Sequence, residues 1–376
     1  MKPYFQLDEH IVHLNHAAVA PWPVVTRDAV IAFANENTSI GSQHYDQWLK
    51  TEQKLKRKLA KLINARWIDE IALLKNTSEG LSLIAQGLSF EAGDNIVIPA
   101  EEFPSNMVVW QALSSQGVDT RTIAVQDADD PEQLLIDAMD ERTRLLSCSS
   151  VQFARGLRLD LDRIGAACRA NDTLFCVDAI QSLGAVGFDV QQCQADFVVA
   201  DGHKWMCAPE GTALFFCRKE IQDMLELRQH GWHMLEDAFD FGQSSDAMKV
   251  VSNAQRFECG SPNMMGVAAL DASLGLLLDI GIDTIEAGVL DNANYLFTEL
   301  ACRPDLKLLT DDAYGRFAGI VTFEKCAVDN TRLYQVLQEN NVLCASRGGG
   351  IRFSPHFYTA KKSIDHALDI VDSFSE

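Results

Sequence analysis

Short apolar runs alternate with longer amphipathic stretches between about residue 72 and residue 217. The apolar runs have the length of buried strands, and helical spacing in several of the stretches between them, such as 159–171, predicts helices. This alternation is typical of an α/β fold, in which helices cover both faces of a sheet. The predicted strands contain residues 96–98, 145–148, 174–177, 197–199 and 213–216.

The pattern changes after about residue 263. There, a helical pattern over 267–278 precedes one predicted strand at 319–323. The chain has 376 residues, which is too long for one small core. We therefore expect a large α/β/α sheet domain over residues 20–262 and a smaller α+β domain over residues 263–376. Further helices are predicted at 23–35, 45–63, 331–339 and 361–374.

Composition and charge exclude several classes of partner. Hydrophobic residues make up 47% of the chain and charged residues 23%, as in a soluble globular protein. The net charge of −21 would repel nucleic acid phosphates and anionic lipid, so we expect neither nucleic acid nor membrane as a partner. Residues 1–8 hold no apolar signal region, which predicts a cytoplasmic protein. Ten cysteines without paired spacing predict buried thiols, and neither disulfides nor a metal site.

Polar side chains with related chemistry follow two neighbouring predicted strands. Asp178 and Gln181 come after one strand, and His203 and Lys204 come after the next. Ligands of such sheets bind outside the carboxyl ends of the strands. A lysine amine can form a Schiff base with an aldehyde, and a carboxylate can keep a pyridinium nitrogen protonated. Taken singly, Lys204 could be a surface cation and Asp178 a helix N-cap, but together they provide what pyridoxal 5′-phosphate (PLP) needs.

The run from Asp201 to Trp205, with Pro209 and Gly211 behind it, strengthens this interpretation. It resembles the Schiff-base signature of the class V aminotransferases of fold type I, a group that includes cysteine desulfurases, kynureninase and isopenicillin N epimerase-like proteins. The resemblance extends from Asn15 to the final helix. It implies a PLP-dependent transferase fold of type I, in which residues 1–19 join the smaller domain.

The resemblance also implies cofactor-binding roles. Residues 76–80 begin a predicted helix, whose free N–H groups could bind an anion or simply be capped by Asn76. The resemblance assigns Thr77 and Ser78 to the PLP phosphate. Further roles follow the same resemblance: Phe103 stacks on the ring, Gln152 lies near cofactor and substrate, Gln181 donates to the phenolic oxygen, and His203 accompanies the catalytic pair Lys204 and Asp178.

Two further segments concern the subunit partner and the substrate. Ser261 lies in a run that resembles the family segment reaching the phosphate of a neighbouring subunit, which implies a homodimer with a shared active site. Arg352 resembles the arginine that grips an amino acid substrate by its carboxylate, a role that suits a guanidinium fork, although a solvated strand arginine is the alternative. Arg347 is a second candidate, and Asn15 is placed beside the substrate.

The signature residues are shared by several reactions of amino acids, so the type of reaction is left open. We expect aminotransferase-type chemistry with Lys204 as acid and base. The alternatives are a C–S lyase of the cysteine desulfurase kind, an epimerase, or a scaffold without catalysis. Asp201 stands where desulfurases carry a phosphate-binding serine, so its carboxylate is expected to point elsewhere. Cys344 follows an apolar run, which predicts a buried thiol and argues against a persulfide on this chain.

Overall fold

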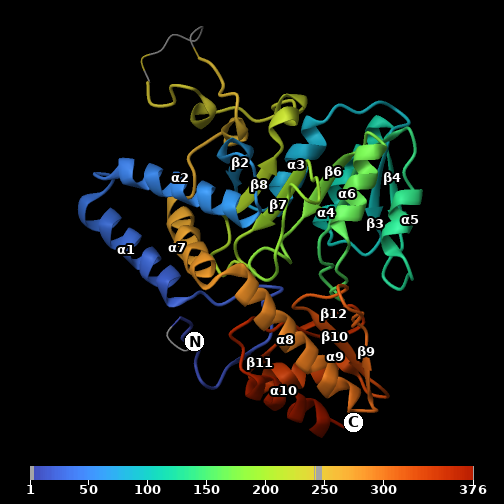
Figure 1. The fold of residues 1–376 in the computed structure, drawn as a ribbon. Coiled ribbons are helices and arrows are strands. Elements are labelled where there is room, and N and C mark those ends of the chain that lie inside the picture. The colour runs from blue at the N-terminus through green and yellow to red at the C-terminus, as the bar shows by residue number, and fades with distance from the viewer. Residues whose placement is uncertain (1–3, 241, 243–247, 376) are drawn as a thin grey trace.

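A seven-stranded sheet forms the centre of the computed structural model, which describes residues 4–240, 242 and 248–375 (Figure 1). The strands from β7 to β4 are parallel to their neighbours, whereas β8 runs antiparallel to both β2 and β7. In order across the sheet, the strands are β2 (Ile71–Leu74), β8 (Ala213–Cys217), β7 (Phe197–Asp201), β6 (Leu174–Asp178), β5 (Thr143–Ser149), β3 (Asn95–Pro99) and β4 (Asp119–Ile123). All five predicted strands are present, and the expected α/β fold is confirmed.

Side chains of the same strand point into two different cores, which is why these strands read as continuous apolar runs. Val97 belongs to one core, together with Leu146 and Val198, whereas its neighbours Ile96 and Ile98 belong to the other. Helices cover both faces of the sheet: α1 (Val24–Ile40), α2 (Tyr45–Leu62), α3 (Thr77–Gly87), α4 (Ser105–Gln111), α5 (Pro131–Asp137), α6 (Leu161–Ala170) and α7 (Met264–Ile280). The edge strand β4 is missing from the sequence prediction because its residues 119–123 are mostly polar and half-buried or exposed.

A smaller antiparallel sheet lies beyond the large one (Figure 1). The order of its strands is β12 (Ala345–Arg347), β13 (Gly350–Phe353), β10 (Val321–Lys325) and β9 (Leu306–Leu308). The helices around it are α8 (Ile282–Ala301), α9 (Asn330–Glu339) and α10 (Lys361–Ser373). The N-terminal strand β1 (Val12–His13) pairs in parallel with β11 (Val342–Leu343) beside this sheet.

The chain passes between the two cores at Gly281, where α7 and α8 meet. Residues of α7, such as Leu270 and Leu274, pack into a core of the large sheet, whereas Leu296 of α8 packs into the core of the small one. The domain boundary expected at residue 262 stays a prediction.

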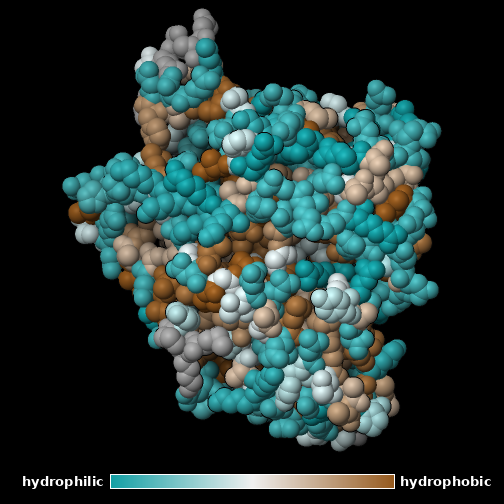
Figure 2. Space-filling view, in the orientation of Figure 1, coloured by the Kyte–Doolittle hydropathy of each residue, from teal (hydrophilic) through white to brown (hydrophobic). Residues whose placement is uncertain are grey.

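Within the described residues, no single helix is long and apolar enough to cross a membrane. Helices α7 and α8 reach the length and apolar composition of a membrane span only when taken together, and the chain bends by 83° between them. Figure 2 shows a largely hydrophilic face with hydrophobic residues gathered around the position of α7.

Candidate functional site

A cavity of about 170 Å³ lies at the carboxyl ends of β6 and β7. Strands β6 and β7 are parallel neighbours, so the loops that follow them emerge on the same edge of the sheet. This is why residues far apart in the sequence meet in one place. The predicted site residues that line the cavity are Thr77, Ser78, Phe103, Asp178, Gln181, His203 and Lys204.

Lys204 and Asp178 are the charged pair of this cavity. Burial lowers the pKa of Lys204 to about 8, although the charge of Asp178 opposes the shift. Burial raises the pKa of Asp178, while hydrogen bonds from Asn106 Nδ2 (2.8 Å) and the Ile180 N–H (3.0 Å) favour its ionised form. The Lys204 ammonium lies 5.7 Å from the centre of the Phe103 ring. A buried acid and a lysine that is readily deprotonated therefore face one small space beside an aromatic ring.

Gln181 is held from two sides. Its Nε2 donates to the backbone oxygen of Ala17 (3.1 Å), and its Oε1 accepts from the Trp205 indole N–H (2.8 Å). One N–H of the amide stays available for the cavity, because an amide nitrogen carries two hydrogens. The role of Gln181 as a donor to a cofactor oxygen stays a prediction.

The start of α3 makes one end of the cavity suited to an anion. Asn76 caps the helix by accepting from the Glu79 N–H (2.9 Å), so the predicted cap exists, and Thr77 and Ser78 stand at the first turn beside it. The Ser78 and Ser105 hydroxyls lie 2.8 Å apart. Helix α3 approaches β7 closely because residue 80 is glycine: a Cβ there would lie only 2.7 Å from Val199 Cγ1. Free helix N–H groups and hydroxyls together bind phosphate well.

Asp201 is one of the residues that line the cavity, and the expectation that its carboxylate points away from a phosphate stays a prediction. Its side chain is buried and lines the cavity, where its Oδ1 lies 3.1 Å from His203 Nδ1. The backbone N–H of Asp201 donates to Thr77 Oγ1 (3.2 Å). The orientation follows from the strand: Asp201 ends β7 inside the sheet, and its carboxylate meets the imidazole of the next loop instead of solvent.

Glu102 is a residue of this site that the sequence prediction missed. Both oxygens of its buried carboxylate accept hydrogen bonds from Ser149, one from the backbone N–H and one from the hydroxyl. Ser149 lines the cavity and lies opposite Asp178 in the pairing of β5 with β6. Burial raises the pKa of Glu102 to about 7, although Ser149 opposes the shift. A glutamate in the turn after a predicted strand reads as an ordinary surface acid, and only the β5–β6 pairing brings it behind Asp178.

Arg352 stands outside the cavity lining but close enough for its charge to help lower the pKa of Lys204. Its Nη1 donates to the Phe153 backbone oxygen (2.5 Å) and its Nη2 to Asn15 Oδ1 (3.3 Å). The buried Nε has no hydrogen-bond partner within the described ranges. Burial lowers the pKa of Arg352 to about 10. A buried guanidinium without a carboxylate partner is a good receptor for the carboxylate of a substrate.

The remaining predicted residues lie farther from the cavity lining. Gln152 Nε2 donates to the Glu101 backbone oxygen (2.7 Å), and the side chain lines a neighbouring groove. Arg347 ends β12 at the surface. Ser261 is exposed and does not line the cavity of its own chain. The structure therefore does not bring Gln152, Arg347 or Ser261 into the Lys204 cavity, and their predicted roles stay predictions.

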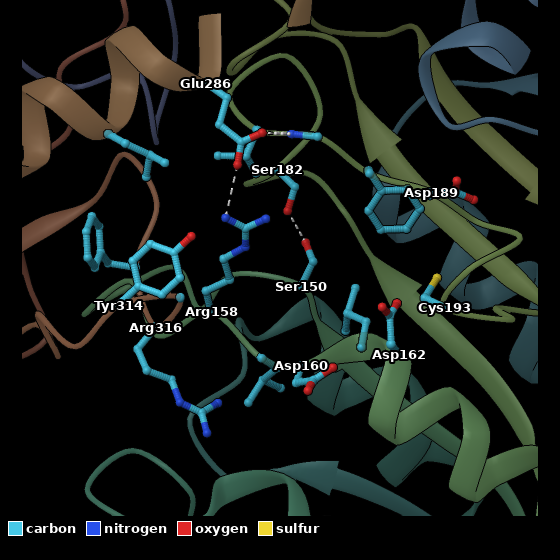
Figure 3. A pocket seen from close by; sticks show the side chains of 18 of the residues that line it. Ser150, Arg158, Asp160, Asp162, Ser182, Asp189, Cys193, Glu286, Tyr314 and Arg316 are labelled. Carbon is cyan, nitrogen blue, oxygen red and sulfur yellow. Dashed lines mark hydrogen bonds and ion pairs between the residues drawn. The ribbon is translucent and has the colours of Figure 1, made fainter. Parts of the chain in front are cut away.

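A second cavity and a buried cluster of acidic and histidine side chains lie elsewhere in the molecule. A larger cavity of about 910 Å³ is lined by parts of α6, α8 and the loop before β10; Glu286 there contacts Arg158 (3.2 Å), and the Ser150 and Ser182 hydroxyls pair (Figure 3). None of the predicted site residues lines it.

The buried side chains of Glu52, His233 and Glu258 bring three possible metal-ligand atoms within 4.8 Å of one another. The Lys56 ammonium lies 3.0 Å from Glu52 and 2.8 Å from Glu258, so a cation of the chain itself already contacts both carboxylates of this cluster.

The residues at the Lys204 cavity fit PLP. The N-terminal turn of α3 with Thr77 and Ser78 would hold the phosphate, Asp178 would hold the ring nitrogen, and Lys204 would bond the aldehyde. Asp201 Oδ1 and His203 Nδ1 lie 3.1 Å apart at this end of the cavity but outside hydrogen-bond geometry, so within the described part of the chain they form an ion-pair contact and no hydrogen bond. Fold and cavity together define a fold type I PLP enzyme.

Comparison with known proteins gives the family. The family model Aminotransferase class-V matches residues 12–365, and the chain belongs to this family. A probable cysteine desulfurase of Methanothermobacter thermautotrophicus is 30% identical, with 94% of this chain and 92% of that protein covered. A probable cysteine desulfurase of Pyrococcus abyssi is 27% identical over 97% of this chain and 94% of its own length. Among solved structures, the cystine C–S lyase C-DES, in complex with its reaction product cysteine persulfide, has the same fold, with a TM-score of 0.89 at 22% identity over 98% of this chain and 99% of that one.

Proposed function

We propose that this protein is a PLP-dependent C–S lyase that acts on a sulfur-containing amino acid. Relatives named as probable cysteine desulfurases support sulfur chemistry over the aminotransferase-type reaction expected from the sequence. The observation that carries the proposal is the position of the thiols. Among the described residues that line the Lys204 cavity there is no cysteine. A desulfurase needs an accessible thiolate to take up the sulfur, whereas a lyase needs only a leaving group that departs with its electrons.

Cys344 was predicted to be a buried thiol that carries no persulfide, and its surroundings make it unsuited to be a nucleophile. It is 2% exposed, and its Sγ lies 3.7 Å from Gln338 Nε2. Burial raises the pKa of Cys344 to about 12. A thiol with this pKa is almost entirely protonated at neutral pH and is a weak nucleophile.

The side chains of the cavity can perform an elimination. Bound PLP would supply the electron sink that stabilises negative charge at the substrate α-carbon. Lys204 would take the α-proton; with a pKa of about 8, about a tenth of its side chains are neutral at pH 7, against fewer than about one in a thousand for an ordinary lysine. Asp178 would hold the ring nitrogen proton, and Arg352 would bind the substrate carboxylate. The β-carbon–sulfur bond then breaks, the sulfur leaves with the electron pair and takes up a proton, and water hydrolyses the released aminoacrylate to pyruvate and ammonia without any oxidant.

The products distinguish the candidate reactions. The holoenzyme is incubated with L-cysteine, L-cystine and S-methyl-L-cysteine. A lyase releases pyruvate and ammonia in equal amounts, a desulfurase releases alanine, and an aminotransferase releases a keto acid without ammonia. We expect pyruvate and ammonia; alanine as the main product would contradict the proposal.

Changing Cys344 to serine is expected to alter the rate of sulfur release by less than about twofold, because this buried thiol takes no part in the elimination. Mass spectrometry of the wild-type chain after turnover should show no persulfide on Cys344. Cys326 is exposed, and its change to serine is the matched control. A persulfide on Cys344, together with a loss of sulfur release in its serine variant, would place the protein among the desulfurases.

We also propose a homodimer. Hydrophobic side chains are exposed on α1 and α7: Val25, Ile31 and Met265 are 38%, 50% and 43% exposed. Exposed apolar side chains on helices that pack side by side suit a subunit interface, and Ser261 lies only a few residues before Met265. The holoenzyme should therefore elute at twice the mass of one chain in light-scattering chromatography, and Ile31→Asp should shift it towards monomer. A monomeric wild type with full PLP occupancy would contradict both the dimer and the predicted role of Ser261.

A further inference from the structure

A second groove opens beside the Lys204 cavity and shares a wall with it. The groove has a volume of about 430 Å³ and includes Gln152, Phe153 and Arg155. Phe153 lines both the groove and the cavity, and its backbone oxygen accepts from Arg352. The cavity, the groove and the hydrogen bond of Arg352 therefore meet at Phe153, and a long sulfur substituent of the substrate would enter the groove beside this residue.

Arg155 lines the groove and is held there by two contacts. Its Nε donates to the backbone oxygen of Gly348 (2.9 Å), and its Nη1 lies 3.2 Å from Asp127 Oδ1. Asp127 is 82% exposed, so this ion pair contributes little and a substrate group can compete with it. Nη2 of Arg155 has no hydrogen-bond partner among the residues that the structure describes. The guanidinium is thus held in position with part of its binding capacity unused.

The turn between β12 and β13 is shaped around Arg155. Gly348 and Gly349 both have positive φ, +62° and +91°, which favours glycine. A Cβ on Gly348 would lie only 2.8 Å from Arg155 Cγ. Any other residue at position 348 would push the arginine out of place. The glycine turn therefore keeps the groove open and the guanidinium at its edge.

The groove carries charges of both signs. Besides Arg155, the acidic residues Glu101, Glu102 and Asp127 line it, together with Gln126 and Gln152. A guanidinium next to carboxylates complements a carboxylate next to an ammonium group. An amino acid head group has this pair of charges.

We infer that this groove binds a second amino acid head group at the far end of the substrate, with Arg155 holding its carboxylate. The substrate class is then a disulfide or thioether that joins two amino acid moieties, as in L-cystine, and Arg155 determines specificity for it. This inference rests on the proposed lyase function.

Three disulfide substrates distinguish the contribution of the distal carboxylate from that of the distal ammonium group. L-cystine has both charges, the mixed disulfide of cysteine with 3-mercaptopropionate keeps only the carboxylate, and the mixed disulfide with cysteamine keeps only the ammonium. For the holoenzyme variant Arg155→Gln we expect KM to rise by about tenfold with the first two substrates, because a charge-assisted hydrogen bond is lost. The change in KM with the cysteamine disulfide should stay below about twofold, and kcat should change little with all three.

Arg332→Gln is the matched control, because Arg332 is a half-exposed arginine of α9 paired with Glu339. It should leave all three KM values unchanged. Equal KM changes with all three disulfides for Arg155→Gln, or no change with any, would overturn the inference.

Substrate binding is also measured through the visible absorbance of the cofactor, which needs no turnover. If the wild type releases no pyruvate from any substrate, the proposed function fails. The dissociation constants of the three disulfides, each compared between Arg155→Gln and Arg332→Gln, then still decide the role of Arg155.

Discussion

Turnover should fall by at least about three to four orders of magnitude when Lys204 is changed to alanine, because the described residues that line the cavity include no second amine to bond the cofactor and move the α-proton. The cavity has no other lysine among its described lining residues. The measurement is pyruvate release by the purified variant reconstituted with PLP. Lys50→Ala, on the exposed face of α2, is the control and should keep the wild-type rate. Retained turnover in Lys204→Ala would refute the assignment.

The pH dependence of cofactor attachment provides an independent check of Lys204. An amine attacks an aldehyde only in its neutral form, and burial lowers the pKa of Lys204 to about 8. The attachment rate of PLP to the cofactor-free chain should therefore rise with pH and level off above about pH 8. Borohydride reduction followed by mass spectrometry should locate the bound cofactor on Lys204. A rate that keeps rising to the usual range of lysine, above pH 10, would show that the amine is not in this buried environment.

The change of Asp178 to asparagine should lower kcat by about two to three orders of magnitude while PLP still binds. The carboxylate is buried, and the loss of its negative charge removes the group that would keep the ring nitrogen protonated. Asparagine retains an oxygen to accept the N–H of Ile180, so the local turn should survive. The measurement is kcat together with the visible spectrum and the melting temperature of the holoenzyme.

Asp160→Asn is the matched control, since Asp160 caps α6 by accepting from the Arg163 N–H (3.1 Å) and asparagine caps equally well. If Asp178→Asn behaves like this control, with an unchanged rate, Asp178 is only a structural cap.

Asp178 and Glu102, the two carboxyl side chains near the expected position of the cofactor ring, were not equally easy to predict from the sequence. Asp178 ends an apolar strand, and its spacing to Lys204 resembles a known family signature. Glu102 lies in a polar turn, and its partner Ser149 is 47 residues away. Asp201 was visible in the sequence, but its contact with His203 was not predicted and is shown only by the structure.

The sequence by itself determined the class of fold and the core of the site. Apolar runs and the polar residues that follow them are neighbours in the chain, and parallel pairing brings the carboxyl ends of β6 and β7 to the same edge. Only the tertiary structure decided which long-range contacts complete the site. Arg352 meets Asn15 across 337 residues, and Arg155 meets Gly348 across 193. The first contact depends on the pairing of the N-terminal segment with the smaller sheet, and the second on how this sheet packs against the large domain. No local pattern of apolar and polar residues encodes either.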